Sequence, residues 1–247
     1  MTRPACLLLH GFGGEPFEML PLAEALSARG FCVSVPLLPG HGESVEAWNR
    51  TGWPDWLACA ARDYETLERE HGRVAVLGLS MGGSLSLALA QRYRPAAVVT
   101  IASPVFLYRF WPPAATDWRL PLLSLLRRWR PVWPNAARKE ESRRIAPWQG
   151  YETSTGLNAL ASLEAGLREV RSCLGKVTAP LLALHAVGDS KVPIENLWEI
   201  TGRTGSKTRE AVVLRIDERV TSRHILTTHA ETREEVARRS VGFVEGV

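Results

Sequence analysis

The sequence predicts an α/β protein built on one mostly parallel sheet of about six or seven strands, with helices on both faces. The first observation behind this prediction is that short apolar runs alternate with amphipathic stretches along the chain. The second is the composition, with 45% hydrophobic and 23% charged residues among 247, which is typical of a globular protein. The third is that a single stretch, 104–150, interrupts the alternation. We therefore expect residues 1–247 to form a single domain that carries 104–150 as an insertion.

Each predicted strand is a short run rich in Val, Leu and Ile, as expected of strands that are buried on both faces of a parallel sheet. These runs are Ala5–Leu9, Phe31–Val35, Val74–Leu77, Ala97–Ile101, Leu181–Leu184 and Ala211–Ile216. The predicted helices lie between and after them, at Phe17–Arg29, Asp55–Glu70, Met81–Tyr93, Leu157–Leu174, Ile194–Gly202 and Thr232–Val244. Thr232 and Glu235 have the spacing of a capping box at the start of the last helix.

The stretch 104–150 is rich in Pro and Trp and strongly basic, with nine Arg or Lys residues and three acidic residues. Its tryptophans are Trp111, Trp118, Trp129, Trp133 and Trp148. So long a break between two strands usually has a function, and we expect a helical cap over the carboxyl edge of the sheet. Some of these tryptophans, with Leu120–Leu126, are candidates to line an apolar pocket, although most are expected to pack the cap onto the core.

Composition excludes several other classes of protein. A formal charge of +4 and a pI of about 9.1 are too mild to indicate a nucleic-acid partner. No run approaches the ~20 apolar residues of a membrane span, and the first apolar run is too short for a signal peptide, so we expect no stable membrane anchor and a cytoplasmic location. The four cysteines show no metal-ligand spacing and are expected to be reduced core thiols. No metal or organic cofactor is implied, and a homodimer is left open.

The run Gly78-Leu79-Ser80-Met81-Gly82 is a G-x-S-x-G motif between a predicted strand and a predicted helix. In that context a tight turn exposes the serine hydroxyl at the sheet edge, and small neighbours are needed because the turn leaves no room for side chains. Ser80 is therefore the candidate nucleophile.

A second glycine-rich run, His10 to Gly14, follows the first predicted strand directly. Acyl transfer develops negative charge on the carbonyl oxygen, and backbone N–H groups that point at this oxygen stabilise it. The backbone amides of Phe12 and Met81 are the expected donors, and Met81 also stands at the start of a helix, where the dipole favours an anion.

A serine nucleophile needs a base, and the base needs an acid that orients it. After a strand–Ser–helix turn of this kind, the partners follow in the order Ser, acid, His. His224 lies between the last predicted strand and the last helix and is the expected base, with His229 as its rival. Asp189, which follows the strand at Leu181–Leu184, is the expected acid, with Asp217 as its rival.

These motifs together resemble the α/β-hydrolase superfamily, and within it the group of small bacterial carboxylesterases and monoacylglycerol lipases. The matching segments cover nearly the whole chain outside 104–150: residues 7–14, 21–26, 38–42, 55–56, 77–83, 188–189, 192–193, Ser222 and His224. The resemblance implies the α/β-hydrolase fold and the cleavage of small-molecule esters, either short- to medium-chain acyl esters or monoacylglycerols. It also implies Ser80, His224 and Asp189 as catalytic triad, with Phe12 and Met81 as oxyanion hole.

The sequence departs from this group at three positions and leaves other functions open. Ala186, Arg223 and His229 replace residues that the group usually has, and Arg223 would disfavour a charged imidazole if it pointed toward His224. An acyl-thioesterase or a carbon–carbon bond hydrolase would use the same triad, and a non-catalytic binding protein could have the same fold.

Overall fold

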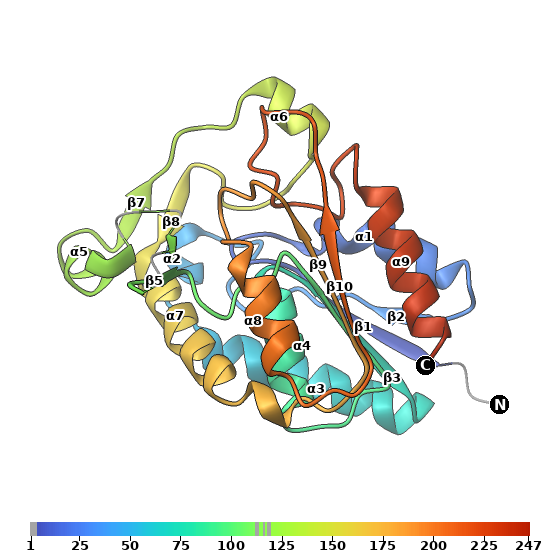
Figure 1. The fold of residues 1–247 in the computed structure, drawn as a ribbon. Helices are drawn as coiled ribbons and strands as arrows, with labels where there is room; N and C mark the ends of the chain where they lie inside the picture. Colours follow the sequence, from blue (N-terminus) through green and yellow to red (C-terminus); the bar gives the residue numbers. More distant parts are fainter. Residues whose placement is uncertain (1–3, 112–113, 116, 118–119) are drawn as a thin grey trace.

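Six parallel strands form the central sheet, in the order β10-β9-β4-β3-β1-β2 (Figure 1). The computed structural model describes residues 4–111, 114–115, 117 and 120–247. The six strands are β1 (Ala5–Leu9), β2 (Cys32–Ser34), β3 (Val74–Leu79), β4 (Val98–Ile101), β9 (Leu181–Ala186) and β10 (Arg209–Leu214). This confirms the predicted α/β class and strand number. Because all the strands run the same way, the loops that follow β1, β3, β9 and β10 meet at one edge of the sheet.

Helices cover both faces of this sheet and enclose two apolar cores (Figure 1). On one face lie α1 (Leu20–Ser27), preceded by the 3₁₀ turn η1 (Pro16–Met19), and α9 (Arg233–Glu245). The other face carries α3 (Trp53–His71), α4 (Met81–Ala90) and α8 (Glu195–Arg203), with α7 (Leu157–Ser172) packed against α3 and α4. Two short elements complete this layer, α2 (Val45–Trp48) and η3 (Leu174–Lys176).

The segment between β4 and α7 contains short helices and two small hairpins rather than helices alone. Its helices are η2 (Leu120–Leu122), α5 (Leu123–Trp129) and α6 (Glu140–Ile145). The hairpins pair β5 (Tyr108–Arg109) with β6 (Ala114–Ala115), and β7 (Val132–Pro134) with β8 (Ser154–Gly156). Trp118 lies outside the described residues. Residues 104–150 therefore contain helices, as expected of the insertion, together with the short strands β5, β6 and β7.

Two local predictions were wrong, and a third was confirmed only in part. The capping box fails because the Thr232 hydroxyl donates to the carbonyl of Leu226, 2.8 Å away, instead of accepting from the helix. Strand β10 is largely exposed, because it forms the outer edge of the sheet. The cysteines are unpaired, but only Cys6 is buried, and the other three are partly exposed. Within the described ranges, no helix has the length and apolar character needed to cross a bilayer.

Candidate active site

Ser80 occupies a strained turn between β3 and α4, with φ 54° and ψ −121°. A non-glycine residue with positive φ is unfavourable and persists only where its surroundings hold it. The Ser80 amide donates to the carbonyl of Ile101 at 2.8 Å. A Cβ atom on Gly78 would lie 2.1 Å from the carbonyl carbon of Gly82, and one on Gly82 would lie 1.9 Å from the carbonyl oxygen of Leu9. The two motif glycines are therefore required by close backbone approach, and the turn presents the serine side chain at the sheet edge.

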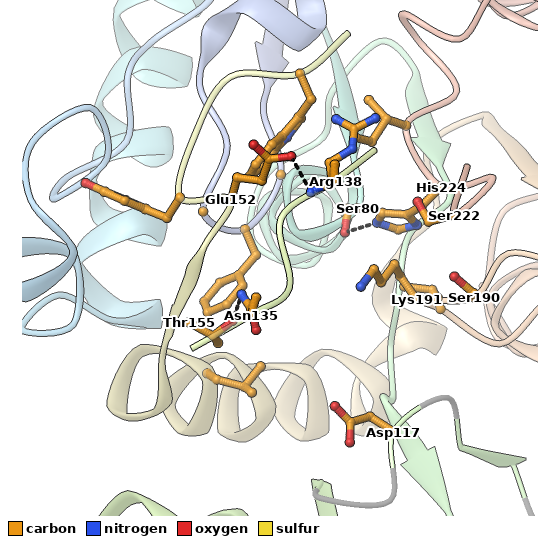
Figure 2. Close-up of a pocket in the computed structure, with 18 of the residues that line it drawn as sticks. Ser80, Asp117, Asn135, Arg138, Glu152, Thr155, Ser190, Lys191, Ser222 and His224 are labelled. Carbon is orange, nitrogen blue, oxygen red and sulfur yellow. Dashed lines mark hydrogen bonds between the residues drawn. The ribbon is translucent and has the colours of Figure 1, made fainter. Parts of the chain in front are cut away.

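Ser80, His224 and Asp189 form a continuous hydrogen-bonded chain. The Ser80 Oγ lies 2.9 Å from Nε2 of His224, and Nδ1 of His224 lies 2.7 Å from Oδ2 of Asp189. Figure 2 shows the Ser80 hydroxyl and the His224 ring facing each other. The three residues come from the loops after β3, β9 and β10, so the common edge of the parallel strands brings them together.

Asp189 is buried, and its carboxylate is held on several sides. Oδ1 accepts the backbone amides of Lys191 and Val192 at 2.8 and 3.0 Å. Burial alone would raise the pKa of Asp189, but the charge of His224 and hydrogen bonds from His185 and His224 outweigh burial and hold this pKa well below its usual range. Asp189 is therefore ionised, and it can fix the orientation of the His224 ring.

His185 also contacts the acid of the site, and the sequence did not identify it as part of the site. Its Nε2 lies 3.4 Å from Oδ2 of Asp189 and 3.1 Å from the carbonyl oxygen of Val192. A nitrogen that faces two acceptors carries the proton, so His185 donates to the acid of the triad. The only sequence signal was the spacing of four residues between His185 and Asp189 in one strand and its loop.

The two rival residues lie apart from this chain. His229 is buried and bonds to Oε1 of Glu218 at 3.0 Å, and Asp217 is exposed. Arg223 does not point at His224: its guanidinium donates to the backbone carbonyl of Glu218. The Glu218 carboxylate accepts from Val220 and Thr221 as well as His229, so this group fixes the loop that carries His224.

The glycine-rich loop at 10–14 is held by two neutral histidines. The Gly13 amide donates to Nε2 of His41 at 3.2 Å, and the Leu38 amide donates to Nε2 of His10 at 3.1 Å. Burial lowers the pKa of His10 to about 3 and that of His41 to about 4, so both rings stay uncharged and can accept. Phe12 reaches the cavity beside Ser80, and Met81 is the first residue of α4, where backbone amides have no partner within the helix.

A cavity of about 780 Å³ opens beside Ser80 and His224, between the sheet edge and the segment from β4 to α7. Its apolar wall contains Leu107, Leu120, Leu123, Leu126, Leu157, Leu160 and Leu163. Asn135 and Thr155 lie across the pocket from His224, and Arg138 and Glu152 lie at another side (Figure 2). Of the tryptophans expected as lining candidates, Trp133 and Trp148 reach the cavity, whereas Trp111 and Trp129 are 85% and 86% exposed. Within the described residues, no cluster of three or more His, Cys, Asp or Glu side chains could bind a metal ion.

The chain is similar to known proteins in both sequence and fold. A family model described as the alpha/beta hydrolase family matches residues 6–239. The thermostable monoacylglycerol lipase of Bacillus sp. (strain H-257) is 45% identical over 87 residues, which span 35% of this chain and 35% of the lipase. The carboxylesterase of Bacillus subtilis (strain 168) is 26% identical over 193 residues, 78% of this chain and 74% of the esterase. A solved structure from work on the metagenome-derived lipolytic enzymes LipS and LipT superposes with a TM-score of 0.85 at 25% identity, covering 100% of this chain and 95% of that one.

Proposed function

The chain belongs to the alpha/beta hydrolase family and is a hydrolase, and we propose that it cleaves carboxylic esters through Ser80, His224 and Asp189. The observation that carries the proposal is the unbroken line of hydrogen bonds from Ser80 Oγ through the His224 ring to the Asp189 carboxylate. Such a line gives a serine hydroxyl a base and gives the base a fixed tautomer. The names of the similar lipase and esterase support the same reaction.

Hydrolysis proceeds in two steps. Ser80 Oγ attacks the acyl carbonyl while Nε2 of His224 takes its proton, and Asp189 stabilises the imidazolium that forms. His224 then protonates the departing alcohol and leaves an acyl-serine. Water, activated by the same imidazole, attacks this intermediate and releases the acid. No step needs a metal or an organic cofactor.

The backbone amides of Phe12 and Met81 are the proposed oxyanion donors. They come from the loop after β1 and from the first turn of α4, the two segments that flank Ser80. One such donor typically lowers the barrier by about 3–4 kcal/mol, because it is already oriented when charge develops. Glycine neighbours allow the loop to approach the nucleophile closely.

The substrate class is proposed from the cavity. Residues 104–150 act as a cap insertion within the single domain, and leucines from this cap and from α7 form the apolar wall. Such a wall suits an acyl chain, and a volume of about 780 Å³ is within the range of ordinary small-molecule sites. We therefore propose short- to medium-chain acyl esters or monoacylglycerols as substrates.

A chain-length series of p-nitrophenyl esters, from acetate to palmitate, tests the proposed function. We expect turnover to peak at short or medium chains, because the leucine wall holds the chain but has a finite depth. Monoacylglycerols of the same acyl lengths should follow the same order, measured by titration of the released acid. A parallel series of acyl thioesters serves as the comparison.

Absence of ester turnover at any chain length, from protein whose circular dichroism shows it folded, would overturn the proposal. A preference for thioesters by more than tenfold in kcat/KM would instead identify a thioesterase.

A further inference from the structure

Glu18 is a buried carboxyl group that the proposed mechanism does not use. It lies in η1, is 1% exposed, and borders the same cavity as Ser80 and His224. A carboxyl group is seldom buried without a partner, because removing it from water is costly. The sequence carries no motif around Glu18, so its position became visible only in the structure.

Two N–H donors from distant segments meet this carboxyl group. The Gly11 amide donates to Oε1, and the indole of Trp148 forms a hydrogen bond with the same carboxyl group. Gly11 lies between the Glu18 carboxyl group and Ser80 in space. A Cβ on Gly11 would lie 2.9 Å from Glu18 Oε1 and 3.4 Å from Ser80 Cβ. Glu18 therefore lies directly behind the loop that carries Phe12.

Trp148 belongs to a short segment, residues 147–151, that runs beside the same loop. Gly150 forms an antiparallel bridge with Gly14, and the Tyr151 amide donates to the carbonyl of Gly13 at 2.9 Å. Gly150 has a positive φ of 146°, and a Cβ there would lie 2.1 Å from the Gly13 oxygen. The segment 147–151 therefore holds the loop at 10–14 on one side. Glu18 contacts the loop through Gly11 and the segment through Trp148.

We propose that Glu18 is a positioning residue, which fixes the Gly11 peptide against Trp148 and so orients the adjacent amide of Phe12 for the developing oxyanion. The proposal rests on the proposed function, since it assigns a role within the same acyl-transfer reaction. A carboxylate suits this role because both its oxygens accept, and bonds from N–H groups to a charged acceptor are stronger than those to a neutral one.

The pKa of Glu18 lies within pH 5.5 to 9, the range in which ester hydrolysis can be assayed. Burial raises its pKa to about 7, against the opposing effect of the hydrogen bonds from Gly11 and Trp148 and of the charge of His224. In the described structure the titratable groups that face it are His224, from the loop after β10, and Glu15, ahead of η1. The stronger, ionised form of the link therefore dominates above pH 7 and is lost as the pH falls below it.

The test compares Glu18→Gln with wild type across pH 5.5 to 9, with short p-nitrophenyl esters as substrates. Glutamine has no charge and replaces one of the two acceptor oxygens with an NH₂ donor, so it holds the two N–H groups more weakly than the carboxylate does. We expect kcat to fall about tenfold at pH 8.5 with KM little changed, because a misplaced oxyanion donor affects the transition state more than the bound substrate. At pH 5.5, where Glu18 of the wild type is protonated, the two proteins should differ by about threefold or less.

Two further variants make the result specific. Glu15→Gln removes a carboxylate three residues away and should match the kcat of wild type at pH 8.5, where Glu18 is ionised in both proteins. Because the Glu15 charge raises the pKa of Glu18, this variant should keep that activity to a slightly lower pH than wild type. Trp148→Phe keeps an aromatic ring but removes the indole N–H, which is the second donor, and it should lower kcat, mainly above pH 7. In the double variant, the losses of Glu18→Gln and Trp148→Phe should not multiply, since both break one link.

A loss in Glu18→Gln that is equal at all pH values would show a packing role, and no loss would show no role; either result overturns the proposal. If Glu18→Gln does not fold, Trp148→Phe becomes the test. A kcat in Trp148→Phe equal to that of wild type would contradict the proposed link between Glu18 and Trp148. Ser80→Ala in the same assays distinguishes failure of the Glu18 proposal from failure of the proposed function. Turnover that persists without Ser80 would reject the triad itself.

Discussion

Replacing Ser80 by alanine is expected to lower kcat by a factor on the order of 10⁴ or more. The substitution removes the only atom of the triad that can form the acyl intermediate. A water molecule beside His224 could still be activated, but it would not be held in place as the serine hydroxyl is. Folding should be little affected, because the side chain contributes one hydrogen bond, to His224. The measurement is kcat and KM for a medium-chain p-nitrophenyl ester, with thermal unfolding as a check.

Ser190→Ala is the matched control for this experiment. Ser190 also lines the cavity and lies near Lys191 and Ser222 (Figure 2), but its described hydrogen bond is made by its backbone amide, to the carbonyl of Ser222. Its removal should change kcat by less than about threefold. Activity retained by Ser80→Ala, or lost equally in both variants, would contradict the assignment of Ser80.

Asp189→Asn is expected to reduce kcat by about 10⁴-fold while leaving the shape of the site intact. The amide oxygen can still accept from Lys191 and Val192, which now bond to Oδ1. The NH₂ group would then face Nδ1 of His224 and favour the tautomer with its proton on Nε2. In that tautomer Nε2 cannot take the proton of Ser80, so the base is lost. His185 loses Oδ2 as an acceptor but keeps its hydrogen bond to the Val192 carbonyl.

Asp217→Asn is the control for this second prediction, because Asp217 is the other acid that the sequence offered and is exposed. It should retain the kcat of wild type. The same assay therefore distinguishes the two acids: a large loss in Asp217→Asn with little change in Asp189→Asn would show that the acid was misassigned.

The main features of the fold and of the candidate triad are accessible from the sequence because they depend on local patterns. A buried run followed by a glycine-rich turn marks the carboxyl end of a parallel strand, and all such ends lie at one edge. That rule places Ser80, Asp189 and His224 at the same edge, and the order Ser, acid, His favours them over their rivals. The structure brings these three side chains within hydrogen-bonding distance.

The remaining features depend on contacts between distant segments, which no local pattern encodes. In the sequence Glu18 is an ordinary acidic residue near the start of a predicted helix. In the structure its hydrogen-bond partners are Gly11 and Trp148. Thr232 and Glu235 have a capping-box spacing, but the hydroxyl finds Leu226 instead. These side chains are placed by tertiary hydrogen bonds that compete with the local pattern and prevail.

The segment 104–150 shows the same limit on a larger scale. Its prolines and tryptophans indicate an insertion, but not that α5 and α6 alternate with strands, nor which aromatic rings face the cavity. Trp133 lines the cavity and Trp129 is exposed, although the two are only four positions apart in the sequence. Burial here depends on how short elements pack over the sheet edge rather than on a repeating pattern.

Covalent labelling with a fluorophosphonate, followed by peptide mapping in a mass spectrometer, tests the central claim most directly. A fluorophosphonate loses fluoride to a serine only where a base and an oxyanion hole activate that serine, and the adduct resembles the tetrahedral intermediate of acyl transfer. We predict one label per chain, on the peptide that contains Ser80, loss of ester turnover in proportion to labelling, and no label on Ser80→Ala. A label on another residue with Ser80 unmodified, or full activity in the labelled protein, would contradict the account.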